Sequence, residues 1–375
     1  MKIGIITLRL HENYGGILQV YALQKTLQRM GHDATLIDKS RFIYMPLFRK
    51  ITSYGKRVIK KILIDKNTVI KWDKKYNNDV RIISTYTYPF ILKYIKRIEA
   101  VYNYSNIKKN DFDAYVVGSD QVWRPMYFGQ NIIQCAYLSF AKNWDVKRIS
   151  YAASFGTKDW EYTQKQTAEC SKLLKQFNAV SVRESSAVEL CKKHFNINAL
   201  HVLDPTMLLK ADDYINLFKA SGTAKSPGTL MCYILDNNKE KENIISHIEK
   251  SFNLKAFSVN SKYEVADAPI EERVQPPVES WLRGFYDAEY VITDSFHACV
   301  FSILFEKPFI VYGNKERGMA RFHSLLSIFG LENRLVTTKD EAEKVITQPI
   351  DWERVNTIKK EWQDKSINFL KENLK

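Results

Sequence analysis

One short polar segment after an apolar segment has the residue types for acid–base chemistry. Thr293-Asp294-Ser295-Phe296-His297 follows a predicted strand over 290–293 and leads into a predicted helix over 297–305. In an open α/β sheet, ligands bind beyond the carboxyl ends of the strands, where helix N-termini attract anions. A histidine there can act as acid or base near neutral pH. The alternative is purely structural, with Asp294 or Ser295 capping the helix and His297 packed in its first turn.

A pair of glycines follows the first predicted strand, residues 2–7. The motif Asn13-Tyr14-Gly15-Gly16 precedes a helical pattern. Adjacent glycines let the backbone approach a ligand closely, and a helix N-terminus favours negative charge. The motif is not the G-x-G-x-x-G fingerprint, so it does not indicate NAD binding. We expect Asn13, Gly15 and Gly16 to contribute to an anion site.

A third polar segment follows the predicted strand 114–118. Ser119, Asp120 and Gln121 supply hydrogen-bonding groups, and Trp123 supplies an aromatic face. This combination suits a sugar, so we assign the acceptor to these residues. The alternative is a capped helix start followed by a tryptophan in the core.

Three arginines complete the candidate site. Arg183 ends the predicted strand 179–183, and Arg317 and Arg321 lie in the segment 316–322. Arginine binds carboxylate and phosphate with two parallel hydrogen bonds. The three side chains therefore suit a small ligand that carries two or three negative charges.

Length and composition limit the class of protein. A chain of 375 residues with 45% hydrophobic residues predicts two domains with sizeable cores. It has no apolar run long enough to span a membrane, and its N-terminus does not resemble a signal peptide. The five cysteines form no C-x-x-C pair and the seven histidines form no H-E-x-x-H motif, so we expect no metal, no disulfide framework and a cytoplasmic location.

The net charge of +14 is concentrated in residues 41–110, which hold seventeen Lys/Arg and four acidic residues. An apolar stripe with basic residues beside it predicts a helix that binds an anionic membrane surface. The stripe consists of Leu47, Ile51, Tyr54, Val58 and Ile62. The alternative is a solvated basic face. We see no nucleic-acid-binding motif and expect no nucleic-acid partner.

Alternating strand and helix patterns predict an α/β fold with two Rossmann-like domains. The first domain covers 1–210 and contains a mostly helical basic insertion at about 41–110. A polar linker leads to a second domain over 225–350, and a helix follows over 351–375. A cleft between two such domains is a favoured place for a ligand.

The motifs named above, in their order, resemble the polysaccharide pyruvyl transferase family, as do Ser181-Val182-Arg183-Glu184 and Asp204-Pro205-Thr206. The resemblance implies a GT-B-like fold and transfer of an enolpyruvyl group from phosphoenolpyruvate to a sugar, which forms a pyruvate ketal in surface or exopolysaccharide biosynthesis. It also implies a sugar or lipid-linked oligosaccharide acceptor and no cofactor.

The resemblance and the chemistry together suggest a role for each residue. We expect His297 to be the general acid and Asp294 to orient it or accept a hydroxyl proton. Several family members carry an arginine two residues before this histidine, where this chain has Ser295. Arg317 or Arg321 would then supply the missing charge, beside Arg183. The alternatives are a GT-B-type glycosyltransferase that uses a nucleotide sugar, and a membrane-associated component of a polysaccharide assembly complex without enzymatic activity.

Overall fold

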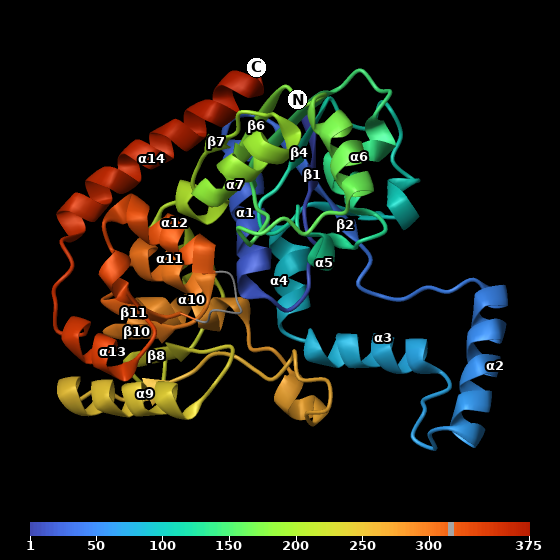
Figure 1. Ribbon diagram of the computed structural model, residues 1–375. Helices are drawn as coiled ribbons and strands as arrows, with labels where there is room; N and C mark the ends of the chain where they lie inside the picture. The colour runs from blue at the N-terminus through green and yellow to red at the C-terminus, as the bar shows by residue number, and fades with distance from the viewer. Residues whose placement is uncertain (314–318) are drawn as a thin grey trace.

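The computed structural model describes residues 1–313 and 319–375, without the side chain of Tyr102. Within these residues the strands form two parallel sheets, one in each half of the molecule (Figure 1). The first sheet has seven strands in the order β3-β2-β1-β4-β5-β6-β7, and the second has five in the order β12-β11-β10-β8-β9. Parallel neighbours need crossover connections, which are usually helices, so both faces of such sheets are covered.

The strands of the first sheet are β1 (Lys2–Ile6), β2 (Asp33–Lys39), β3 (Arg97–Ala100), β4 (Ala114–Val117), β5 (Lys147–Ala153), β6 (Ala179–Val182) and β7 (Leu200–His201). Those of the second are β8 (Leu230–Tyr233), β9 (Ala256–Phe257), β10 (Tyr290–Thr293), β11 (Phe309–Tyr312) and β12 (Leu335–Val336). The central strands β4 and β10 are buried at every residue. Continuous apolar runs of this kind are typical of parallel strands that are covered on both faces.

The helices of the first half are α1 (Tyr14–Arg29), α2 (Leu47–Leu63), α3 (Trp72–Ile83), α4 (Thr87–Tyr94), α5 (Pro125–Phe128), α6 (Gln164–Leu174), α7 (Ser185–Leu190) and α8 (Ala211–Ala220). Those that follow are α9 (Lys239–Phe252), α10 (Val278–Asp287), α11 (Phe296–Leu304), α12 (Met319–Phe329), α13 (Lys339–Val345) and α14 (Trp352–Asn373). None of the described helices is long and apolar enough to cross a bilayer.

Two helices begin where the halves meet. Asn13 caps α1, because its side-chain oxygen accepts a hydrogen bond of 3.0 Å from the Gly16 N–H. Helix α11 follows β10 directly, with Ser295 at its N-cap position. The starts of α1 and α11 contact each other. The loops at the carboxyl ends of strands from both sheets therefore converge on one place.

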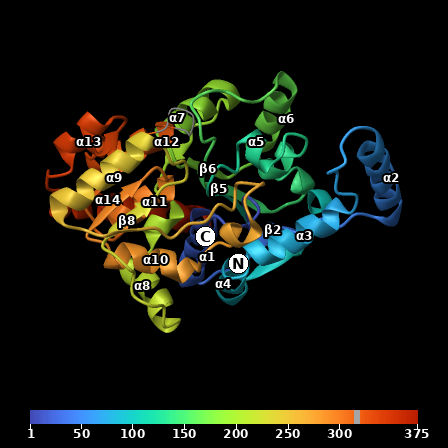
Figure 2. The same cartoon turned by 90° about the horizontal axis from the view of Figure 1, so that it is seen from below.

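The basic segment 41–110, which we expected to be mostly helical, contains the α-helices α2, α3 and α4 and also the edge strand β3, which was not predicted. Strand β3 pairs with β2 through Ile98 and Ile37 among others. Helix α2 projects away from the body of the molecule, and α3 connects it to the rest (Figures 1 and 2). The insertion is therefore partly a piece of the first sheet and partly an arm.

The C-terminal helix α14 returns from the second half to the first (Figure 1). Its Ser366 hydroxyl accepts a hydrogen bond of 3.0 Å from the Leu203 N–H, and the ring of Phe369 lies 6.4 Å from that of Tyr151. This helix therefore links the two halves outside the cleft.

Candidate active site

A cavity of about 200 Å³ lies between the two halves. Polar and charged side chains from loops of both sheets make up much of its wall. The wall contains Leu8, His11, Asn13, Gly15, Asp120, Gln121, Arg124, Tyr127, Tyr233, Leu235, Glu264, Trp281, Asp294, Ser295, Phe296, His297 and Arg321. Four of the segments chosen from the sequence thus contribute to one cavity, although they are far apart along the chain.

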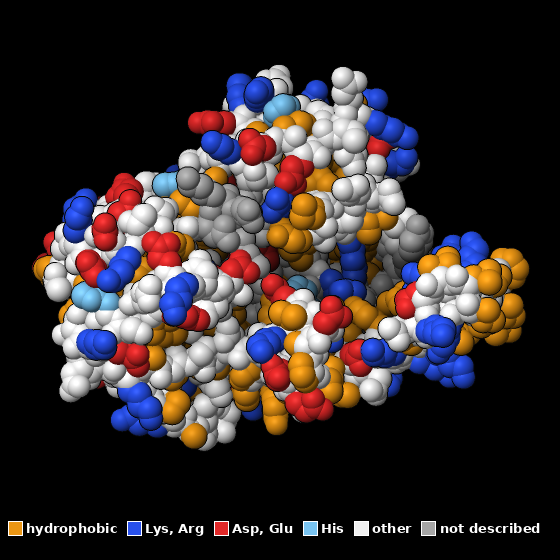
Figure 3. All heavy atoms as spheres, turned by 60° about the horizontal axis from the view of Figure 1, so that its bottom comes forward, with side chains coloured by type: hydrophobic (Ala, Val, Ile, Leu, Met, Phe, Trp, Pro, Cys, Tyr) orange, Lys and Arg blue, Asp and Glu red, His pale blue; other side chains and the backbone are white. Residues whose placement is uncertain are grey.

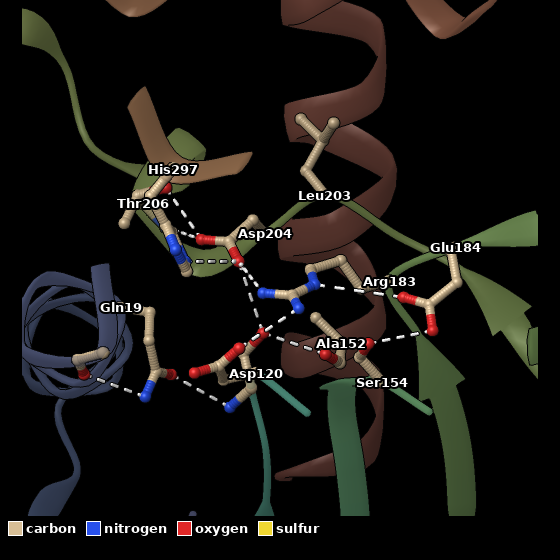
Figure 4. Close-up of polar contacts among 12 residues, drawn as sticks. Gln19, Asp120, Ala152, Ser154, Arg183, Glu184, Leu203, Asp204, Thr206 and His297 are labelled. Atoms are coloured by element: carbon tan, nitrogen blue, oxygen red, sulfur yellow. Dashed lines mark hydrogen bonds and ion pairs between the residues drawn. The ribbon is translucent and has the colours of Figure 1, made fainter. Parts of the chain in front are cut away.

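His297 is buried at the start of α11, between the two halves of the molecule. On one side is Gly15 of α1, which leaves so little room that an added Cβ would stand 2.0 Å from His297 Nδ1. On the other side, His297 Nε2 lies 3.6 Å from Asp204 Oδ2, an ion-pair distance (Figure 4). Gly15 is therefore needed to make room for the imidazole, and it also lines the cavity.

Asp204, just after β7, is held in one orientation by several donors. Its Oδ1 accepts hydrogen bonds from the Thr206 N–H at 3.0 Å and the Thr206 hydroxyl at 2.7 Å. Its Oδ2 accepts from Arg183 at 2.9 Å and from the Ser119 hydroxyl at 3.4 Å. Burial alone would raise the pKa of Asp204, but His297 and Arg183 outweigh burial and lower this pKa below its usual range. A fixed carboxylate therefore faces His297.

Arg183 lies beneath the cavity and outside its wall. Its side chain is 1% exposed, and it binds Asp204 and Asp120, the latter at 3.2 Å (Figure 4). Its guanidinium also lies 4.6 Å from the centre of the Phe296 ring. Burial by itself would raise the pKa of Asp120. The positive charge of Arg183, followed by that of His297, outweighs burial, so the pKa of Asp120 is lowered. As described, Arg183 positions two carboxylates and does not face the space where we expected it to hold a donor.

Arg321, from α12, does reach the cavity wall. Its guanidinium lies 5.5 Å from the centre of the Phe296 ring, which Arg183 also contacts. Burial and then the charge of Arg183 lower the pKa of Arg321 to about 10, so it stays a cation at neutral pH. Ser295 also lines the cavity, and Arg317 lies outside the described residues. Arg321 and Ser295 thus line the same cavity.

We had expected Asp294 to orient His297, but the structure does not place it to do so. Its Oδ1 accepts a hydrogen bond of 2.7 Å from the Leu235 N–H, and its Oδ2 binds the ammonium of Lys241 at 2.7 Å and the Asp236 N–H at 3.1 Å. Both oxygens thus hold the loop after β8 and a buried lysine. The carboxylate beside His297 is Asp204, for which the sequence had suggested no role.

The acceptor assignment is wrong for two of its four residues. Trp123 is buried in the core of the first half, where its ring stacks on Tyr137 at 5.1 Å. Ser119 is buried too, and its hydroxyl donates to the Ala152 carbonyl at 2.9 Å. Neither can present a face to a sugar. Asp120 and Gln121 do line the cavity.

The cavity also contains residues that we had not chosen. His11 accepts a hydrogen bond of 3.3 Å at Nδ1 from the Asn13 N–H, and burial, followed by the charge of Arg9, lowers the pKa of His11 to about 4. His11 is therefore neutral at neutral pH. Arg124 forms an ion pair of 2.7 Å with Glu161 at the same edge. His11 and Arg124 both lie close to a chosen motif in the sequence. Neither directly follows a predicted strand, so the sequence pattern did not single them out.

A histidine paired with a carboxylate, here His297 with Asp204, can donate and accept protons. The cavity wall also contains Arg321, which can attract an anion. Within residues 1–313 and 319–375, we find no group of three or more His, Cys, Asp or Glu side chains able to hold a metal ion. The side chains that line the cavity offer acid–base and electrostatic chemistry of their own.

Comparison with known proteins identifies a family. The family described as polysaccharide pyruvyl transferase matches residues 13–316, a range that includes the basic insertion. No curated protein sequence matches the chain.

Similar solved structures come from other enzymes. UDP-GlcNAc 2-epimerase from Neisseria meningitidis, solved with UDP-GlcNAc bound, is 10% identical, with 100% of this chain and 99% of that chain covered and a TM-score of 0.50. The corresponding epimerase from Methanocaldococcus jannaschii is 12% identical, with 95% of each chain covered and a TM-score of 0.47. A spinosyn rhamnosyltransferase is 9% identical, with 100% and 99% covered and a TM-score of 0.45.

At such low identity these likenesses concern the fold alone. The first covers both halves, and together with the two parallel sheets it confirms the expected α/β class with two Rossmann-like domains in a GT-B-like arrangement. The match to the family covers most of the sequence, from residue 13 to residue 316. The chain belongs to the polysaccharide pyruvyl transferase family.

Proposed function

We propose that this protein is a transferase that moves an enolpyruvyl group from phosphoenolpyruvate onto a sugar and closes it into a pyruvate ketal, in surface or exopolysaccharide biosynthesis. The observation that carries the proposal is the pair of His297 and Asp204, set in a cavity whose wall includes Arg321. Membership of the family supports a reaction on a polysaccharide or its precursor.

The residues suit the steps of this reaction. The methylene carbon of phosphoenolpyruvate takes a proton, for which His297 is the donor, while a sugar hydroxyl attacks the neighbouring carbon. Phosphate leaves with its bonding electrons, and a second hydroxyl closes the ketal. Of the two hydroxyl protons, one restores His297 and one leaves with phosphate. The ionised Asp204 stabilises the imidazolium before and after transfer.

Arg321 has the charge and the place to hold the donor. A cation beside the leaving phosphate stabilises the negative charge that develops during transfer. Arg317 remains a proposed second donor-binding residue, since it follows β11 only a few positions before Arg321. Asp120 and Gln121 are our proposed acceptor contacts, because they enter the wall from the first half.

We assign the enzyme to the cytoplasm, on the inner face of the plasma membrane, where a lipid-linked acceptor is found. The charge of residues 41–110 supports this location.

The experiment incubates the purified protein with phosphoenolpyruvate and a panel of sugar and lipid-linked acceptors. We expect phosphate release that depends on the acceptor, together with a product that gains the mass of pyruvic acid minus water. Thermal unfolding is measured in parallel, because a ligand that binds the folded state raises the melting temperature. Stabilisation by a nucleotide sugar, with no effect of phosphoenolpyruvate, would instead favour a glycosyltransferase. Loss of His297 without consequence in the cell would favour a component that is not enzymatic.

A further inference from the structure

Helix α2 is an exposed arm of this molecule. It spans Leu47–Leu63, and none of these seventeen residues, all of which the structure describes, is buried. The ribbon views from two directions show it apart from both sheets (Figures 1 and 2), and none of its residues lines the cavity described above. A helix of this length needs an apolar partner to be stable in water, because most helical stability in proteins comes from packing.

One side of α2 is apolar and uncovered. At 100° per residue, Leu47, Phe48, Ile51, Val58 and Ile62 fall within one arc of the helix. Leu47 is 75% exposed, Phe48 77% and Ile62 73%. Figure 3 shows hydrophobic side chains gathered at this end of the molecule. A contiguous apolar face of this kind marks an interaction site.

The opposite side of α2 is basic. The helix contains six basic residues and no acidic residue. They are Arg49, Lys50, Lys56, Arg57, Lys60 and Lys61. Figure 3 shows this mixture as Lys and Arg side chains around the apolar patch. An apolar face with cations on its flanks matches the interface of an anionic bilayer, where apolar groups enter the acyl region and cations meet headgroups.

The contacts of α2 with the rest of the chain leave the apolar face open. Trp72 donates a hydrogen bond of 3.2 Å to Ser53, and Tyr54 donates one of 2.7 Å to Asp73. The guanidinium of Arg57 also lies 5.1 Å from the centre of the Trp72 ring. These contacts fix the start of α3 against the basic side of α2, to which Arg57 belongs. The arm is thus attached on its basic side and presents its apolar face.

We infer that α2 is the membrane-docking element of this protein, lying in the plane of an anionic bilayer with the face of Leu47, Phe48, Ile51, Val58 and Ile62 inserted. Insertion by such helices reaches about 5–10 Å. A second copy of the chain is the less favoured occupant, because two α2 helices would bring two sets of six cations together. The inference rests on the membrane location proposed above and is independent of the donor.

Sedimentation with vesicles tests this inference on the full chain. The probes are vesicles of phosphatidylcholine alone and of phosphatidylcholine with phosphatidylglycerol. We expect the wild type to bind only the second kind and to be released by salt, since surface charges are screened over about 8 Å at physiological ionic strength.

Two variants on α2 are compared with one off it. Phe48→Ser with Ile62→Ser removes apolar contacts worth about 1.5–3 kcal/mol each, so affinity should fall roughly tenfold or more per residue. Lys56→Glu with Lys60→Glu should reduce it roughly thirtyfold or more, because each basic residue contributes about 1 kcal/mol. The matched control is Lys74→Glu with Lys75→Glu, the same charge change at exposed positions of α3. It should bind far better than the α2 double reversal.

Three outcomes would overturn the inference. They are no binding of the wild type to phosphatidylglycerol vesicles at low salt, equal loss in the α3 control, and a dimer in analytical ultracentrifugation that Phe48→Ser with Ile62→Ser dissociates. Turnover with a soluble acceptor is measured on the same variants and should stay unchanged. A failure of vesicle binding with intact turnover rejects only the docking role of α2, whereas vesicle binding without any turnover rejects only the transferase.

Discussion

Replacing Gly15 by alanine should disable the site while the protein stays folded. The new Cβ would lie 2.0 Å from His297 Nδ1 and 2.2 Å from His297 Cγ. Ordinary contact begins at 3.4 Å, so the imidazole would have to move by roughly 1.4 Å. A misplacement of about 1 Å can cost about 10²-fold in rate, and we expect turnover to fall by about that much or more. Overpacking should lower the free energy of unfolding by about 1–3 kcal/mol.

The neighbouring Gly16 provides a matched control. We had expected Gly16 to contribute to the anion site, but it is not among the residues that line the cavity. A Cβ there would meet Asn13 at no less than 3.8 Å, which is an ordinary contact, so Gly16→Ala should keep near-normal turnover. The assay is acceptor-dependent phosphate release from phosphoenolpyruvate, with urea unfolding to compare stability. Equal turnover in the two alanine variants would refute the claim that turnover depends on the imidazole position that Gly15 permits.

Three further predictions concern charged groups. Arg183→Lys should lower the free energy of unfolding by about 1–3 kcal/mol, measured in urea, because a lysine cannot satisfy both carboxylates that this arginine binds. Asp294→Asn should lower it by about 3–5 kcal/mol, because the buried Lys241 loses its counter-charge; turnover per folded molecule should fall by less than about 10²-fold, and a larger fall would restore a catalytic role to Asp294. Burial lowers the pKa of His201 and of His11 to about 4, so between about pH 6.5 and pH 4 the unfolded chain binds more protons than the folded chain. The free energy of unfolding should therefore decline as the pH is lowered through this window. His201→Gln should make the urea midpoint depend less steeply on pH.

The sequence predicted most of the sheet because buried parallel strands are apolar along their whole length. Strands β4 and β10 are buried throughout, β1 is buried after its exposed Lys2, and all three lie where their patterns indicated. Strand β3 escaped because Arg97 and Glu99 give it an edge strand's polar pattern inside a basic segment. Strand β12 was not predicted and has only two residues; β7 and β9 are as short, but they lie within the longer predicted strands 199–203 and 254–259. A short strand stands out in the sequence only where a longer apolar pattern surrounds it.

The sequence could predict site residues that directly follow a strand. It could not predict which side chains from distant segments contact each other. His297 was found because it follows β10 and opens a helix. Its partner Asp204 stands in the other half of the molecule, and the two meet through the packing of α11 against α1 and against the short helix Pro205–Leu208 that follows Asp204. Trp123 was misassigned since its position after β4 does not reveal which way the ring points. Pairings between distant segments follow from tertiary packing, which local patterns do not encode.

The most direct test of the central claim is the fate of one proton. The reaction is run in D₂O with phosphoenolpyruvate and an acceptor, and the product is analysed by NMR and mass spectrometry. If His297 protonates the methylene carbon, each ketal methyl group carries one deuterium, one phosphate is released for each ketal, and His297→Gln loses about 10²–10⁴-fold in rate. A folded His297→Gln variant with normal turnover, or a wild-type product that contains no pyruvate ketal, would contradict the account.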